Sequence, residues 1–318
     1  MTLNNQTSAV LMNAVLAGDT DTVRYLLGCG TSPDISDKNG QKALHVAVAS
    51  GKINIVRTLL YHGADINSKN ILGWCPIHVA ATLRRSDIMN ILLEHREIDV
   101  DIPDLHGRSA LHRAVAADLY INVRSLLTSG ADVNIADNYG KRPIHISAHH
   151  GNVHVTGLLV AYFAKCDVVD SIGQTPLHLA AESGDADLVK LLVFHGADVN
   201  KCNHIGQTPL HVACRCGQTK IVQCLLNRGA LLSVKDHSKQ KPETVATSAG
   251  NDDVIKVIKE HRRSLVMYAS SDYAVKLDNK TNDKMANSQN NTSCDQLNMS
   301  TKKKRKGIKD HMDKCKVM

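Results

Sequence analysis

The clearest chemistry in the sequence lies at its end, Cys315-Lys316-Val317-Met318. A cysteine four residues from the end, an aliphatic residue at the third position and a final Met fit the C-a-a-X pattern, in which the thiol is alkylated by an isoprenoid. A final Met favours farnesyl, and Lys316 occupies the more permissive of the two middle positions. The pattern therefore predicts farnesylation of Cys315, removal of the last three residues and methylation of the new carboxyl end.

A basic run lies just upstream of Cys315. A single lipid chain binds a membrane weakly, so stable attachment takes a second signal such as a polybasic patch. Each basic side chain near an anionic leaflet adds about 1 kcal/mol, so the run could contribute about 5 kcal/mol. Together with the lipid it predicts attachment to an anionic membrane surface. Two alternatives remain open, a nuclear import signal and an unmodified basic tail. The run consists of Lys302, Lys303, Lys304, Arg305 and Lys306.

Histidines are the other abundant reactive residues, 17 in all. Six recur once per repeated segment, which indicates a structural role, and they are His45, His78, His112, His145, His178 and His211. The local cluster of His149, His150 and His154 is poorly placed for a shared metal, because Gly151 interrupts it at a predicted helix end. The sequence has no phosphate-binding loop, no G-x-S-x-G and no HExxH motif. We therefore expect no catalytic residue, no metal and no cofactor.

Composition restricts the class of protein further. Hydrophobic residues make up 43% of the 318 residues but aromatic ones only 3%, so the apolar content is mostly small and aliphatic and suits thin, stacked layers. The nine cysteines are irregularly spaced, as in a reduced, intracellular protein. Of the net charge of +7, +5 lies in residues 264–318. The remainder carries no strong signal for nucleic acid, and we expect no direct nucleic-acid partner.

The elements that position these residues follow from an internal repeat. GQTPLHLAAESGDADLVKLLVFHGADVN, from Gly173, returns as GQTPLHVACRCGQTKIVQCLLNRGA from Gly206. Weaker or atypical copies bring the number to eight, with starts near residues 7, 40, 73, 107, 140, 173, 206 and 239. The sequence thus predicts a short N-terminal extension (1–6), an array (7–263) and a tail (264–318) that is polar and disordered.

Each unit has the signals of a turn followed by two short helices. In the unit from Gly173, Thr175 can cap the first helix, Pro176 suits its first position, and Gly184 ends it. Apolar residues then predict the buried faces of the two helices, Leu177, Ala180 and Ala181 on the first and Leu188, Val189, Leu191 and Leu192 on the second. A single unit cannot bury these faces alone, so the units must stack.

This 33-residue pattern resembles ankyrin repeats. The resemblance implies an all-α repeat solenoid of β-turn plus helix-turn-helix units, in which the recurring histidine hydrogen-bonds neighbouring backbone. Some units depart from the pattern: Arg84 and Asp118 replace the glycine after the first helix, and Arg96 and Phe163 the one after the second. These departures predict local loosening or an altered surface in the third to fifth units.

The resemblance also implies protein binding through the turn tips and the exposed side of the first helix. Apolar residues on such a ridge are typical of an interface, although scattered exposed apolar residues also occur without one. The predicted surface comprises Ile71, Leu72, Trp74, Leu105, His106, Arg108, Tyr139, Lys141, Ile172, His204, Ile205, Gln207, His149, His150, Glu182 and Arg215. In this family the asparagine that ends Ala-Asp-Ile/Val-Asn can be hydroxylated, and Asn67, Asn134 and Asn200 match that position.

Three hypotheses of function follow. The leading one is a monomeric, non-enzymatic adaptor that binds a protein partner and is tethered to the cytoplasmic face of a membrane by its lipidated, polybasic end. The second is a nuclear regulator that binds transcription-factor or chromatin partners, similar to the inhibitors of NF-kappa-B, with the basic run (302–306) as import signal. The third is a targeting subunit of a phosphatase or a ubiquitin ligase.

Overall fold

The structure of the protein is a computed structural model that describes residues 2–265. In this range the regular structure is helical apart from one isolated β-bridge between Ser36 and Lys42. The helices are α1 (Thr2–Ala17), α2 (Thr20–Gly28), α3 (Ala43–Ala49), α4 (Ile53–Tyr61), α5 (Pro76–Ala81), α6 (Ser86–Leu93), α7 (Ala110–Ala116), α8 (Tyr120–Thr128), α9 (Pro143–His149), α10 (Val153–Ala161), α11 (Pro176–Ser183), α12 (Ala186–Phe194), α13 (Pro209–Arg215), α14 (Thr219–Leu226) and α15 (Pro242–Ser248), and residues 252–265 are also helical.

The helices begin and end where the local signals place them. α11 starts after Thr175, whose Oγ1 accepts a hydrogen bond from the backbone N–H of His178 at 3.4 Å. Pro176 occupies its first position, and Gly184, at φ +86°, ends it in the left-handed conformation that glycine adopts without strain. At the start of α12, Asp185 accepts hydrogen bonds from the backbone N–H groups of Asp187 and Leu188. Chain-local chemistry therefore sets the lengths of these helices.

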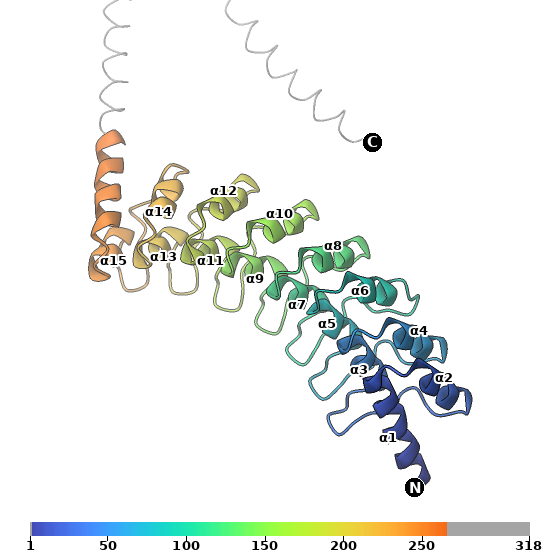
Figure 1. Cartoon of the computed structure of the whole chain (residues 1–318). Coiled ribbons are helices and arrows are strands. Elements are labelled where there is room, and N and C mark those ends of the chain that lie inside the picture. The colour runs from blue at the N-terminus through green and yellow to red at the C-terminus, as the bar shows by residue number, and fades with distance from the viewer. Residues whose placement is uncertain (1, 266–318) are drawn as a thin grey trace, which may run out of the picture. The chain divides into compact units, whose positions relative to one another are not determined.

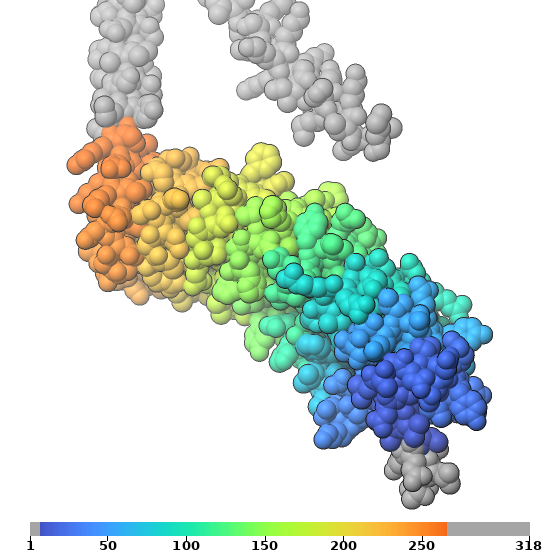
Figure 2. Space-filling model, in the orientation of Figure 1, coloured from blue at the N-terminus to red at the C-terminus, as the bar shows by residue number. Residues whose placement is uncertain are grey.

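Within the unit Met1–His261, consecutive helices pair, and the pairs stack into two rows. The odd-numbered helices contact one another in one row and the even-numbered helices in the other (Figure 1). On the face shown in Figure 2, successive pairs lie directly against each other. The buried side chains between them are mainly Ala, Val, Leu and Ile, as the low aromatic content predicts. The predicted all-α repeat solenoid is confirmed.

Long loops join each pair to the next and project on the side away from the even-numbered helices (Figure 1). We call these loops fingers and name each by the four residues of its tip, 37–40, 70–73, 104–107, 137–140, 170–173, 203–206 and 236–239. An Asp or Asn opens every tip, and in the tip 104–107 Asp104 Oδ1 accepts hydrogen bonds from the backbone N–H groups of His106 at 2.8 Å and Arg108 at 2.9 Å. The fingers are thus rigid turns closed by their first side chain.

Backbone hydrogen bonds join neighbouring fingers. The N–H of Asn138 donates to the carbonyl of His106 at 3.0 Å, and that of Ser171 to Tyr139 at 2.9 Å. The N–H of His204 donates to Ile172 at 3.1 Å, and that of His237 to Ile205 at 3.0 Å. The fingers therefore form one connected edge of the array rather than separate loops.

The structure differs from the sequence prediction at one buried face and at the N-terminus, and it shows how two of the replaced glycines are accommodated. Leu191, predicted on the buried face of α12, is only partly buried, because the face of α12 is narrower than the apolar run in its sequence. Asp118 and Phe163 keep the left-handed conformation of the glycines that they replace, at φ +55° and +67°. α1 begins at Thr2, so helix also covers residues assigned to an N-terminal extension.

No helix within residues 2–265 is both long enough and apolar enough to cross a membrane. The predicted lipidation site Cys315, the basic run 302–306 and the C-a-a-X segment 315–318 lie outside the described residues, as does all of the predicted tail after residue 265.

Candidate functional site

Six apolar side chains project from five consecutive finger tips. We call them the finger-tip ridge, and between 52% and 66% of the surface of each is exposed: Ile71, Leu72, Leu105, Tyr139, Ile172 and Ile205. The first finger instead carries Lys38 and Asn39, and the last carries His237 and Ser238. The ridge is therefore confined to the middle of the array.

The backbone of the ridge is held in place. Gly73, at φ +71°, lies so close to the next finger that a Cβ atom there would meet the backbone nitrogen of Leu105 at 2.7 Å. Together with the hydrogen bonds between fingers, this close packing fixes the spacing of the ridge side chains. A rigid, exposed row of apolar and aromatic groups can bind a protein segment with little loss of conformational entropy.

The other predicted surface residues fall into two groups. His106, His149, His150, Glu182, His204 and Arg215 are exposed, whereas Trp74, Arg108, Lys141 and Gln207 are partly buried. Trp74 is the notable difference from the expectation of a solvent-facing ring. The guanidinium of Arg113, in the next unit, lies 4.1 Å from the centre of its ring. Trp74 therefore contributes chiefly to the contact between two units.

Arg113 was not among the predicted site residues, although the sequence holds a signal for it. The residue after the recurring histidine is apolar in the other units, namely Val46, Val79, Ile146, Leu179 and Val212, and is Arg only at position 113. Arg113 donates to Oδ2 of the buried Asp104. Burial raises the pKa of Asp104, but Arg113 and the N–H donors of Arg108 and His106 outweigh it, so that the pKa lies below its ordinary value.

The six recurring histidines each connect two units through their rings. Nδ1 accepts a hydrogen bond from the backbone N–H three residues earlier, as from Thr175 to His178 at 3.2 Å. Nε2 donates to a carbonyl in the following finger, as from His178 to Gln207 at 2.8 Å. The other five rings make the same pair of contacts. With both nitrogens occupied and the rings buried, these histidines hold the stack together.

Burial lowers the pKa of all six rings, that of His178 to about 4. The carbonyl that accepts from Nε2 works in the opposite direction but only partly offsets burial. Of the exposed histidines, His149 and His150 stack edge to face, with ring centres 5.5 Å apart. Within residues 2–265 no group of three or more His, Cys, Asp or Glu side chains is arranged to hold a metal ion.

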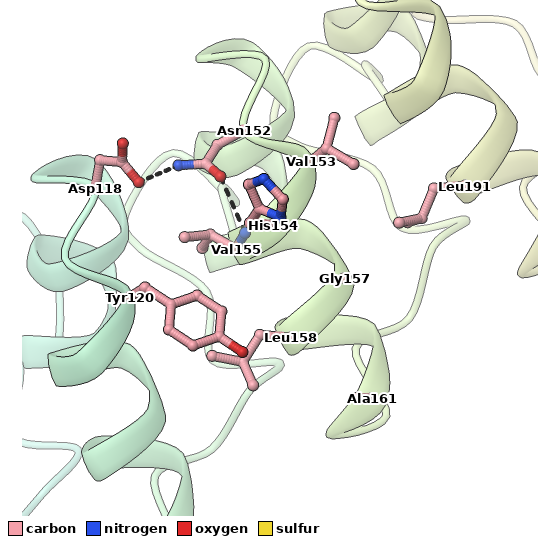
Figure 3. Close-up of a pocket in the computed structure, with 10 residues that line it drawn as sticks. All are labelled: Asp118, Tyr120, Asn152, Val153, His154, Val155, Gly157, Leu158, Ala161 and Leu191. Atoms are coloured by element: carbon pink, nitrogen blue, oxygen red, sulfur yellow. Dashed lines mark hydrogen bonds between the residues drawn. The ribbon is translucent and has the colours of Figure 1, made fainter.

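A groove of about 740 Å³ lies on the even-numbered helices, away from the fingers (Figure 3). Gly157 of α10 contributes to it, where the neighbouring helices carry longer polar residues such as Arg124 and Lys190. At one end, Asn152 hydrogen-bonds Asp118 and the backbone N–H of Val155 (Figure 3). The lining is mainly apolar.

The family model described as ankyrin repeats (3 copies) matches residues 2–70, 68–137, 111–203 and 184–267. The chain belongs to the ankyrin repeat family. Its array is accordingly a protein–protein interaction module. No curated protein matches the chain.

Three asparagines of this ankyrin array link neighbouring units. Nδ2 of Asn67 donates to the carbonyl of Glu97 at 2.7 Å, and Oδ1 accepts from the N–H of Asp99 at 3.0 Å. Asn134 and Asn200 make equivalent pairs of bonds.

Proposed function

We propose that the protein is a non-enzymatic adaptor whose finger-tip ridge binds a protein partner. The observation that carries the proposal is the row of six apolar side chains on five rigid, hydrogen-bonded fingers. Contiguous exposed apolar groups on a soluble domain mark interaction sites, and aromatic and aliphatic anchors at the centre of an interface supply most of its affinity. Leu105, Tyr139 and Ile172 are the central anchors of this surface.

The second part of the proposal concerns the tail. Farnesylated Cys315, together with the basic run 302–306, would hold the adaptor at the cytoplasmic face of a membrane. Support comes from the sequence: a C-a-a-X pattern and a polybasic patch are the two signals that stable anchoring requires.

The binding surface is tested by comparing two sets of exposed residues. A ridge variant, Leu105→Asn/Tyr139→Ser/Ile172→Asn, should lose partners that the wild type captures from cells, by at least about tenfold for three lost anchors. The control is Tyr25→Ser/Phe194→Ser, which removes the exposed rings of α2 and α12. Both proteins should keep the wild-type circular dichroism and melting temperature. Equal capture by the ridge variant and the wild type would overturn the proposal.

The tail is tested by the mass of the C-terminal peptide from eukaryotic cells, together with the localisation of the wild type and Cys315→Ser. We expect a farnesylated, methylated cysteine at the carboxyl end and loss of membrane association in the variant. An unmodified terminus with both proteins in the nucleus would instead assign the basic run to import. Replacing residues 302–306 by alanine distinguishes the contribution of the basic run from that of the lipid.

A further inference from the structure

The array divides its charge unevenly along its length. Residues 1–200 carry a net charge of −4, whereas residues 201–250 hold seven Lys and Arg against two Asp and Glu, a net charge of +5. The small net charge of the array is therefore an average over an acidic part and a basic part. The basic part contains the last finger, 236–239, and α15. A concentration of one sign of charge favours ligands of the opposite sign.

Three lysines give the last finger its charge, and we call them the basic finger: Lys235, Lys239 and Lys241. All three are exposed, and none of their ammonium groups forms a hydrogen bond or an ion pair within residues 2–265. Of the two acidic residues in the segment, Asp236 is buried and closes the turn, and Glu243 is partly buried at the start of α15. The positive charge therefore faces solvent.

Lys241 lacks a partner that the same position has elsewhere in the array. Lys42 occupies this position before α3, and its Nζ lies 3.4 Å from Oδ1 of Asp34 and 3.7 Å from Oδ2 of Asp65. Ser233 stands where the unit of α3 has Asp34. The last unit therefore keeps the lysine but not the carboxylate that precedes it by eight residues.

Lys235 lacks its usual acceptor for a different reason. Lys69 occupies the same position, and its Nζ donates to the carbonyl of Pro103 in the following unit at 2.8 Å. No finger follows 236–239 within residues 2–265, so Lys235 has no such carbonyl to bind. Its ammonium group is left to a ligand from outside the array.

Lys239 adopts a backbone conformation that favours glycine. Its φ is +60°, and the last residue of every other finger tip is a glycine. A lysine in the left-handed region lowers the stability of the fold, and the exposed side chain makes no polar contact within the described residues that would offset the loss. Strain of this kind concentrates at functional sites. Lys239 thus adds a charge to the finger at the expense of stability.

The basic finger continues the surface that the finger-tip ridge forms. The N–H of His237 donates to the carbonyl of Ile205 at 3.0 Å, so the last finger is fixed beside the last side chain of the ridge. Packed helices lie about 8–10 Å apart, and an extended chain rises about 3.3 Å per residue. A partner segment that contacts Ile205 can therefore reach the basic finger about three residues further along.

We propose that the basic finger binds an acidic stretch of the partner, rich in Asp and Glu, that continues the segment bound by the finger-tip ridge. The inference rests on the proposed function, because it names the chemistry of the same partner: apolar anchors followed within about three residues by carboxylates. Three ammonium groups on one finger can each meet a carboxylate, and together they steer the approach of an acidic segment.

The composition of the segment favours a peptide over a nucleic acid. Residues 201–250 contain no Phe, Trp or Tyr. Proteins that bind single-stranded nucleic acids combine a basic groove with aromatic rings on which the bases stack. The basic finger has the charge but not the rings.

The first test titrates the full-length, isotope-labelled protein with acetyl-hexaglutamate amide. Residues 302–306 are replaced by alanine so that the basic run does not compete for the peptide. The amide signals of Lys235, Lys239 and Lys241 should shift saturably, and acetyl-hexaglutamine amide, which has no charge, should leave them in place. Sodium chloride at about 0.5 M should remove most of the response. No saturable shift in this finger, or equal shifts with both peptides, would contradict the proposal.

A variant in the same background removes the three charges. The basic-finger variant, Lys235→Gln/Lys239→Gly/Lys241→Gln, should bind hexaglutamate about tenfold more weakly. It should melt at or above the temperature of the parent protein, because Lys239→Gly relieves the left-handed strain. Weaker binding then cannot result from unfolding.

The control variant, Arg57→Gln/Arg124→Gln/Lys165→Gln, removes an equal charge at exposed positions of other units. It should bind hexaglutamate as the parent protein does. If the control and the basic-finger variant bind the peptide equally, the response depends only on net charge and the proposal fails.

Two other anionic ligands test the class of partner. An oligothymidine of about twelve nucleotides and vesicles of phosphatidylserine are titrated with the same protein at about 0.15 M salt. We expect both to bind more weakly than hexaglutamate. Tighter binding of either one, lost in the basic-finger variant, would assign the finger to a nucleic acid or to a lipid surface and would overturn the proposal.

Partner capture separates this inference from the proposed function. We expect the basic-finger variant to capture the partner about tenfold less than the wild type at about 0.15 M salt, and the difference to shrink at about 0.5 M, where exposed charges are screened. If the ridge variant loses the partner while the basic-finger variant keeps it at both salt concentrations, the acidic-segment inference fails and the adaptor function stands. If the ridge variant captures the partner as the wild type does, the adaptor function fails, whatever hexaglutamate does.

Discussion

Phe163 is the residue whose backbone conformation fits its side chain least well. It adopts φ +67° at a position where most other units have glycine, and 87% of its surface is exposed. A left-handed conformation costs a non-glycine residue about 1–2 kcal/mol. Because the ring is exposed, burial offsets little of this strain.

Replacing Phe163 by Gly should therefore stabilise the array by about 0.5–1 kcal/mol, measured by urea denaturation. Gly196 is the matched control, since it occupies the same position in the next unit at φ +90° and has nothing within 4 Å of a built Cβ. Gly196→Ala should destabilise by a similar amount through backbone strain alone. A loss of stability in Phe163→Gly would show that the ring packs against the array in solution.

At the scale of elements, the end of α5 depends on a side chain from another unit. Arg84 stands where most other units have the glycine that ends the first helix. Asn122 of α8, only 2% exposed, donates to the carbonyls of Ala80 at 3.2 Å, Ala81 at 3.4 Å and Leu83 at 2.8 Å. The end of α5 is thus supported by the neighbouring unit, at one of the positions where the sequence predicted local loosening or an altered surface.

Asn122→Ile should destabilise the protein by about 1–3 kcal/mol, because it removes the Nδ2 donor from the carbonyls of Ala81 and Leu83. This holds even though the equivalent residues of the flanking even-numbered helices are apolar, Ile88 in α6 and Val155 in α10. Ile88→Val, at the same position of α6 and without such carbonyl contacts, should cost only about 0.5–1.5 kcal/mol. Thermal and urea denaturation give both values, and a stabilised Asn122→Ile would mean that water satisfies these carbonyls.

At the scale of the whole molecule, six buried histidines link the units in series, and all are neutral when folded. Their folded pKa values lie below the ordinary value of 6.5, that of His178 at about 4. Between these values a proton binds the unfolded chain but not the folded one. The contribution of these rings to the free energy of unfolding is therefore greatest above pH 6.5. It decreases as the pH drops toward 4.

Each such ring should contribute a slope of up to about 1.4 kcal/mol per pH unit between its own folded pKa and 6.5. Urea denaturation at several pH values between 7.5 and 5 should show a steep loss of stability. His178→Gln should reduce the slope by the share of that one ring. A stability that is flat from pH 7.5 to 5 would show that these rings titrate alike in the folded and unfolded chains.

Much of the architecture follows from the sequence, because its signals are local and recur in each unit. In the most regular units, such as that of α11, the capping Thr, the first-turn Pro and the terminal Gly bound the first helix within a few residues, and the 33-residue period then requires stacking. The period also places residues such as Leu105 and Ile172 at turn tips, where the structure finds them exposed. Lipidation of Cys315 is a prediction from the sequence alone.

Only the tertiary structure decided which side chains pair between units. The cover that Arg113 provides over Trp74 and the support of α5 by Asn122 both depend on contacts between residues about 30 or more positions apart. Local propensity sets each unit, but the surface between two units depends on the particular side chains that meet there.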